Sequence, residues 1–194
     1  MAIDTSMAFA PVRASLSTAP LGTSVSAIVG TGALPGTFTD HGSIDLSNGY
    51  SFKPAGTPTR TTYRSFWNRE IFHVSETPSD DSPMWDVTFN ESNIIVIEEA
   101  FGASIDANGK LVYVGGIPAH KVMVLDLADA SGLKTRRFVS PDTSVALNGS
   151  INPTGSKDLE TYPLQFAANP TTGVLGVGVT GLFAMWSNWL EDLS

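Results

Sequence analysis

The 194-residue chain contains no cysteine and has few charged residues. The lack of cysteine excludes disulfides, thiolate metal ligands and a cysteine nucleophile. Asp, Glu, Lys and Arg make up 15% of the chain, whereas ordinary soluble domains contain about 25%. The chain is 42% hydrophobic and has 18 glycines. This composition predicts that other protein subunits cover part of the surface. A free β-rich domain with Thr, Ser and Gly on its exposed faces is the alternative.

Positive charge is also scarce. The formal net charge is −8, and the 11 Lys and Arg residues are scattered, with Arg136-Arg137 as the only adjacent pair. A protein that grips nucleic acid normally shows a basic patch, so we expect no tight DNA binding. An acidic chain is still compatible with a conduit for DNA, because a lumen that repels phosphate does not hold the polymer.

Long apolar runs and signatures of catalysis are missing as well. No stretch of about 20 apolar residues could cross a membrane as a helix, and residues 1–22 lack the apolar core of a secretory signal. We therefore expect a soluble protein that is not secreted. His41, His73 and His120 are far apart and show no metal-site spacing. The sequence predicts no enzyme, no catalytic residue, no metal site and no cofactor.

Turn signals divide the chain into short extended runs, which predicts a mostly β fold. Asn-Gly dipeptides, a strong signal for tight turns, occur at residues 48–49, 108–109 and 148–149. The candidate strands are 25–29, 43–47, 61–75, 84–89, 111–114, 121–127, 135–140, 143–151, 160–168 and 174–185.

We expect one domain over residues 1–194. Residues 1–24 are rich in Ala, Ser, Thr and Pro without a period, so they are expected to form an extended N-terminal arm that orders only against a neighbour. Residues 25–185 are expected to form the β-core and residues 186–194 a C-terminal tail. Segment 48–62 is a Pro-, Gly- and Thr-rich connection, long enough to be functional or disordered.

The helix candidate is residues 90–101. Asn90 can cap it, Glu91 suits the positive end of the helix dipole, and Gly102 can end it. The β-branched run 94–97 favours a strand by propensity. We prefer the helix because the cap, the acidic first turn and the terminal glycine agree.

If this segment is helical, Ile94, Ile97 and Phe101 fall at i, i+3 and i+7, with Ala100 beside them. They would form one apolar stripe that packs on a sheet. The sequence thus predicts a mostly β, α+β domain: an antiparallel β-sandwich or partly closed barrel with one packed helix.

Aromatic residues gather near the C-terminus. Trp186, Trp189 and Leu190 fall at i, i+3 and i+4, so they would form one apolar stripe if this segment were helical. Two interpretations stay open. The tail folds back on its own core, or its aromatic side chains anchor in an adjacent subunit.

Several short motifs follow one another over about residues 34–185. In chain order they are Asp40-His41-Gly42 with Ser47-Asn48-Gly49, Glu91-Ser92-Asn93 with Ala100-Phe101-Gly102, Arg136-Arg137-Phe138-Val139-Ser140-Pro141, and Tyr162-Pro163-Leu164-Gln165-Phe166. This series resembles the major tail tube proteins of long, non-contractile-tailed bacteriophages. Two positions depart from the family pattern: His41 replaces an apolar residue, and Asp142 stands where a basic residue commonly follows the proline.

The resemblance implies a structural virion protein that performs no chemistry. Its subunits would form hexameric rings that stack head to tail into the tail tube, through which phage DNA passes without specific binding. The other partners would be the tape measure protein and the tail terminator and baseplate proteins, without any membrane. The protein would be assembled in the bacterial host cytoplasm and reside in the virion tail.

The resemblance also suggests inter-subunit contacts. In the family, a long hairpin loop at the position of residues 48–62 reaches the next ring, so Lys53 and Arg60 are the expected stacking contacts. Trp186 and Trp189 are candidate inter-subunit anchors. Two other classes stay open. One is a β-sandwich module for carbohydrate binding or virion-surface attachment, which exposed aromatic residues around a groove would favour. The other, weaker one is an enzyme that uses scattered Asp, Glu and His.

Overall fold

The computed structural model describes most of the chain and gives a mostly β fold. The described residues are 9–26, 28, 30–42, 44, 50–54, 59–64, 71–77, 82–90, 93–113, 119–151, 160–172 and 180–188. Within them the elements are β1 (Arg13–Pro20), β2 (Thr39–Asp40), β3 (Tyr50–Lys53), β4 (Thr59–Arg64), β5 (Ile71–Thr77), β6 (Met84–Phe89), α1 (Ile94–Phe101), β7 (Ala119–Ala128), β8 (Thr135–Leu147), β9 (Tyr162–Ala168), β10 (Thr171–Thr172), β11 (Thr180–Gly181) and β12 (Ala184–Ser187).

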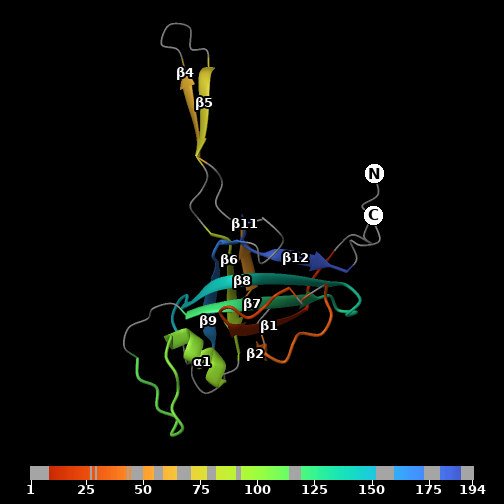
Figure 1. Cartoon of the computed structure of the whole chain (residues 1–194), viewed down its shortest axis with the longest axis vertical. Helices are drawn as coiled ribbons and strands as arrows, with labels where there is room; N and C mark the ends of the chain where they lie inside the picture. Colours follow the sequence, from red (N-terminus) through yellow and green to blue (C-terminus); the bar gives the residue numbers. More distant parts are fainter. Residues whose placement is uncertain are drawn as a thin grey trace.

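Eight strands form one antiparallel sheet, in the order β2-β1-β7-β8-β9-β6-β3, with β12 beside β8. The sheet ends at β2 and β3, so it does not close into a barrel. In Figure 1, β1, β7 and β8 run roughly horizontally, whereas β6 and β9 run roughly vertically. The sheet therefore folds over itself into two layers. The predicted β-sandwich with one helix agrees with this arrangement.

Strand β8 joins the two layers. Its residues 136–139 pair with β12, and its residues 143–147 pair with β9, while β7 runs along its other edge. Pro141 lies between the two halves and has no N–H to give to a ladder. The register with β7 also shifts between Lys121 and Met123. These two irregularities allow one long strand to bend from one layer into the other.

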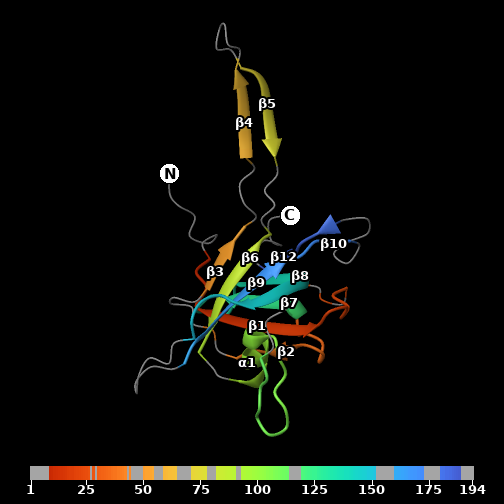
Figure 2. The same ribbon diagram turned by 90° about the vertical axis from the view of Figure 1, so that its left-hand side faces the viewer.

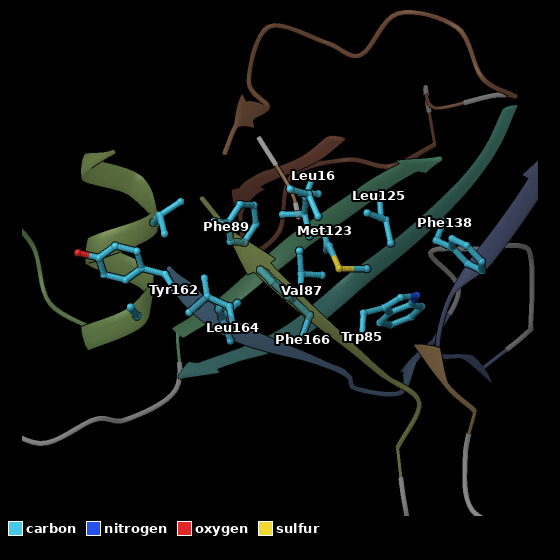
Figure 3. Close-up of a cluster of buried hydrophobic side chains, with 14 of the residues drawn as sticks. Leu16, Trp85, Val87, Phe89, Met123, Leu125, Phe138, Tyr162, Leu164 and Phe166 are labelled. Atoms are coloured by element: carbon cyan, nitrogen blue, oxygen red, sulfur yellow. The ribbon is translucent and has the colours of Figure 1, made fainter. Parts of the chain in front are cut away.

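The hydrophobic core fills the space between the layers (Figure 3). In β6, Trp85, Val87 and Phe89 are fully buried and alternate with half-buried residues, as the sequence pattern predicts for a half-buried strand. Phe89 and Leu164 lie toward α1, and Trp85 and Phe138 lie at the other end of the core. Each large apolar side chain that is fully buried contributes about 1.5–3 kcal/mol.

An ion pair inside the sheet anchors a surface segment. Arg137 on β8 is almost fully buried and holds both oxygens of Asp126 on β7, with N–O distances of 2.6 and 2.7 Å. Its remaining nitrogen donates to the carbonyls of Gly30 and Gly32. Bidentate geometry of this kind makes an arginine–carboxylate pair strong and specific. Arg137 is the second arginine of the motif segment Arg136 to Pro141 described above.

Helix α1 begins later than predicted. Asn93, not Asn90, is its N-cap, and the Asn93 side chain accepts a 2.9 Å hydrogen bond from the Val96 N–H. Asn93 has the extended backbone that a cap requires (φ −84°, ψ 161°). The first turn therefore contains no acidic residue. The predicted end of the helix is confirmed, because Gly102 takes a left-handed conformation with φ 59°.

The predicted packing face of the helix is right for Ile97, Ala100 and Phe101 and wrong for Ile94. Val96, Glu99 and Ala100 face the sheet and are buried, whereas Ile94 is 62% exposed. Ile97 and Phe101 are half-buried and pack on the edge of the core. The apolar period missed Glu99, because Thr18 and Lys121 of the sheet and His41 supply it with polar partners.

The predicted N-terminal arm is also wrong for residues 13–20. They form β1, which pairs with β7 along its whole length. Leu16 and Ala19 belong to the core, with exposed fractions of 0% and 2%. The strand shows no clear apolar period because the polar Thr18 and the small Ala19 share its buried positions with Leu16. Residues 1–8 lie outside the described part.

Two predicted strands are not strands. The described residues of 25–29 form a turn in which the Ile28 N–H donates to the Val25 carbonyl. Within 111–114, Leu111 forms only an isolated bridge to Ile105 across the predicted turn at 108–109. Val25 and Ile28 are buried in a core cluster without pairing in a ladder, whereas Val112 and Tyr113 are exposed.

Other strand boundaries changed. Range 61–75 is split into β4 and β5, whereas 135–140 and the first part of 143–151, up to Leu147, belong to the single strand β8. Ile44 is the described residue of 43–47, and it forms an isolated bridge to Phe89. Range 174–185 contains β11 and the start of β12 among its described residues.

The helix face can be tested by two matched substitutions. Val96→Asp should lower the free energy of unfolding by about 3 kcal/mol or more, because it buries an unpaired charge. Ile94→Asp should change it by less than about 0.5 kcal/mol, because the site is exposed and a carboxylate suits the first helical turn. Urea unfolding followed by tryptophan fluorescence measures both. Equal losses would contradict the assigned face.

Candidate functional site

The most distinctive feature of the surface is the hairpin formed by β4 and β5. Its register runs from Thr59 opposite Thr77 to Arg64 opposite Ile71, and it forms a separate two-stranded sheet. Figures 1 and 2 show it standing away from the body of the protein. The predicted loop 48–62 is therefore wrong in its bounds: Tyr50–Lys53 is a strand of the main sheet, and residues 59–62 already belong to β4.

The two strands of the hairpin pair with each other and with no other described strand. A single two-stranded hairpin is at best marginally stable in water, and it needs further strands or a packing surface. Its strands carry Arg60, Tyr63, Arg64 and Phe72. Tyrosine and arginine dominate binding energy at protein interfaces, and aromatic residues in general are enriched there. Geometry and composition together make β4–β5 the candidate site for contact with another protein.

Lys53 is the last residue of β3, the strand that precedes this hairpin in the chain, and it forms an ion pair with Asp86. Its Nζ is 2.6 Å from Asp86 Oδ2, and the lysine side chain remains 59% exposed. An exposed ion pair contributes only about 0–1 kcal/mol. Lys53 therefore links β3 to β6 through this ion pair, while most of its side chain remains exposed to solvent.

Asp86 joins four segments on the outer face of the sheet. Besides Lys53, its carboxylate accepts hydrogen bonds from Ser51, Asn148 and Gln165, at 2.8 to 3.2 Å. Burial by itself raises the pKa of Asp86, but the hydrogen bonds from Lys53, Gln165 and Ser51 and the charge of Lys53 together bring its pKa below the usual value. The folded protein thus favours the ionised form.

This shift predicts how stability depends on pH. Asp86 stabilises the fold above its unfolded pKa of about 3.9, and the contribution is lost as the pH falls through the lower folded pKa. Asp86→Asn should therefore reduce stability at neutral pH and flatten the decline between about pH 5 and pH 2. Thermal unfolding over this pH range measures the difference. Parallel curves for both proteins would show that Asp86 does not carry the effect.

The other predicted contact residues fall in different places. Arg60 lies in β4, directly opposite Glu76 of β5. Trp186 lies in β12, so the predicted helical stripe is wrong there; it packs on the second core cluster, which consists of Ala19, Val25, Ile28, Val122, Val124 and Val139. Of the two interpretations of the C-terminal aromatics, packing on the chain's own core holds for Trp186. Trp189 lies outside the described residues.

A buried polar cluster holds α1 on the sheet, and the sequence did not predict it. Glu99 Oε2 lies 2.6 Å from His41 Nε2, and Glu99 Oε1 accepts a 2.9 Å hydrogen bond from Thr18. Lys121 Nζ is 4.0 Å from the same oxygen. Both His41 and Glu99 are almost fully buried. The Asn93 side chain also donates to the His41 carbonyl at 2.6 Å, so two of the motif segments meet at this point.

Removing one partner of this cluster should be costly. Glu99→Leu leaves His41 buried without its carboxylate and should destabilise the protein by about 3–5 kcal/mol. The double variant His41→Leu, Glu99→Leu should be more stable than Glu99→Leu alone, because a buried pair can be replaced by apolar residues. Chemical denaturation of the single and double variants tests this. A further loss of stability in the double variant would contradict the assigned pairing.

The described part of the surface also contains a groove beside β1 and β7. One groove of about 690 Å³ is lined by Val12, Arg13, Ala14, Ser15, Thr31, Ile44, Asn90, Asp126, Leu127, Ala128 and Thr135. None of these is aromatic, so the groove lacks the feature that would favour a carbohydrate-binding module. Among the described residues, no group of three or more His, Asp and Glu could hold a metal ion. In the same part of the chain, no helix is long and apolar enough to cross a membrane.

The features that sequence reasoning missed share one cause. The partners of Glu99 come from three separate segments, at residues 18, 41 and 121, and only folding brings them together. The one available signal was the pair of glutamates in an otherwise apolar helix. Comparison of the sequence with models of known families, and with curated proteins, finds no match.

Proposed function

We propose that this protein is the repeating subunit of a phage tail tube, assembling into hexameric rings that stack head to tail around the DNA path. The projecting β4–β5 hairpin carries the proposal. A hairpin with so little internal support is best explained as half of a contact that another subunit completes. A contact between two different surfaces of identical subunits also produces rings or open filaments, whichever the geometry allows.

Other observations also support the proposal. The chain has few charged residues for a free monomer. The motif segments that carry the resemblance also contact one another, through Asn93 and His41. The net charge of −8 suits a lumen in which DNA slides without binding.

In the proposed assembly, strands of six subunits surround the DNA path and the hairpin reaches from one ring to the next. Arg60 in the hairpin and Lys53 at the end of β3 would both contribute to stacking. The other partners would be the tape measure, tail terminator and baseplate proteins, and the assembled protein would reside in the virion tail. The subunit would perform no chemistry.

Removing the hairpin tests the function. Lys53 and Met84 are a register pair, so replacing residues 55–82 with Asn-Gly leaves a four-residue loop between them. Pro83 is kept because its carbonyl accepts from the Ala168 N–H. The full chain should form rings or tubes in negative-stain micrographs. The shortened chain should keep its cooperative melt but form no tubes.

Either of two results would refute the proposal. One is a full chain that stays a monodisperse monomer in light scattering at high concentration. The other is a shortened chain that forms tubes of normal length. Arg60→Glu should weaken assembly more mildly, in a manner that added salt reduces. Arg60 is better suited to charge reversal than Lys53, because Lys53 also pairs with Asp86.

A further inference from the structure

Two Asn-Gly pairs in the described part of the chain lie at the surface. They are Asn108-Gly109 and Asn148-Gly149, and all four residues are exposed. Both glycines have positive φ angles, of 78° and 129°, which other residues rarely adopt. The third Asn-Gly pair of the sequence, at residues 48–49, lies outside the described residues. The two described pairs therefore share a sequence and an exposure, and they differ in their contacts.

An asparagine followed by glycine can deamidate without an enzyme. The glycine backbone nitrogen attacks the side-chain carbonyl carbon of the asparagine, and the new C–N bond closes a succinimide ring. The bond from that carbon to the side-chain nitrogen breaks, and this nitrogen leaves as ammonia with the proton of the glycine N–H. Water then opens the ring at either carbonyl and gives aspartate or isoaspartate. The net reaction consumes one water, releases one ammonia and adds one negative charge at neutral pH.

The fold holds Asn148 through three contacts. Its side-chain nitrogen donates a 2.9 Å hydrogen bond to Asp86 Oδ1, and its backbone N–H donates to the Pro163 carbonyl at 2.8 Å. A Cβ on Gly149 would lie 3.4 Å from Pro163 Cγ, so the backbone of the turn packs against that ring. The attack requires the Asn148 side chain to turn toward the Gly149 nitrogen. Each of these contacts opposes that movement.

Asp86 is a firm anchor for the Asn148 side chain. Its carboxylate also accepts hydrogen bonds from Gln165 and Ser51 and pairs with Lys53. A hydrogen bond to an ionised acceptor is roughly twice as strong as one between neutral groups. Deamidation of Asn148 would also place a second carboxylate beside Asp86, where like charges repel. The site thus resists both the attack and its product.

Asn108 has no comparable anchor. Its side-chain amide forms no hydrogen bond to any residue that the structure describes. The backbone N–H groups of Asn108 and Gly109 each donate a 2.9 Å hydrogen bond to Asp106, inside a turn whose residues 106–110 are all exposed. A Cβ on Gly109 would meet nothing within 4 Å. Exposed segments with few contacts open locally at low free-energy cost, so these two hydrogen bonds delay the attack only slightly.

Of the two pairs, we infer that Asn108 is the site at which the folded protein deamidates, and that Asp86 protects Asn148 from the same reaction. The sequence alone assigns both pairs the same reactivity. The hydrogen bond between Asn148 and Asp86 makes the difference. The inference concerns the single subunit and is independent of the proposed function.

The first test compares folded protein with guanidinium-unfolded protein during incubation at mildly alkaline pH. Mass spectrometry of the peptides that contain Asn108 and Asn148 measures aspartate and isoaspartate at each site. Both sites should react at similar rates in the unfolded chain. Folding should slow Asn148 by roughly tenfold or more, the factor that a hydrogen bond to a charged group supplies. It should slow Asn108 by less than about threefold. Equal protection of both sites would overturn the inference.

The second test identifies the protecting group. Asp86→Ala removes the acceptor and should bring the deamidation rate of Asn148 in the folded protein to within about threefold of the unfolded rate. Asn108 should keep its wild-type rate. Lys53→Met is the matched control, because it removes another partner of Asp86 and leaves the bond to Asn148. Asn148 should stay protected in this control.

A cooperative melt shows whether each variant is folded. If Asp86→Ala has none, Asp86→Asn replaces it, because a neutral acceptor binds the Asn148 amide more weakly. Faster deamidation of Asn148 in a folded Asp86 variant than in Lys53→Met supports the inference. Equal rates in the Asp86 variant and in Lys53→Met would show that Asp86 does not protect Asn148.

Discussion

The fold depends on the bend in β8. One strand of 13 residues serves both layers, because its two halves have different partners on one edge and share β7 on the other. Pro141 interrupts the ladder where the strand changes layers, and the Ser140 hydroxyl donates to the Leu182 carbonyl beside it. The ion pair between Arg137 and Asp126 ties the first half of β8 to β7. Without this bend the sheet could not fold over its own core, and α1 would have no layer to cover.

The helix shows how polar interactions inside a core select one arrangement among several. Apolar burial alone would accept either flank of α1, because most of its residues are hydrophobic. Glu99 removes this freedom, since its carboxylate is buried only where Thr18 and His41 can satisfy it. A buried ionic group of this kind gives specificity more readily than it gives stability. Its effect here is to leave Ile94 exposed.

The projecting hairpin has a physical meaning in the proposed assembly. A two-stranded hairpin without further support is at best marginally stable in a free monomer. It becomes favourable when a second subunit supplies hydrogen bonds or apolar area. The proposed subunit therefore folds around its own enclosed core and leaves the β4–β5 hairpin for assembly.

The sequence by itself determined the mostly β class, the single strand 84–89 with its alternating pattern, and the end of the helix at Gly102. These depend on neighbours in the chain, so local rules suffice. The bent β8, the core strand β1 and the helix face depended on tertiary structure, because their partners are distant in sequence. Lys53 and Arg60 were expected beside the hairpin region, but only pairing between β4 and β5 defined the projecting element. The buried Glu99 cluster was decided wholly by folding, since three separate segments must meet before a charged helix residue can face a core.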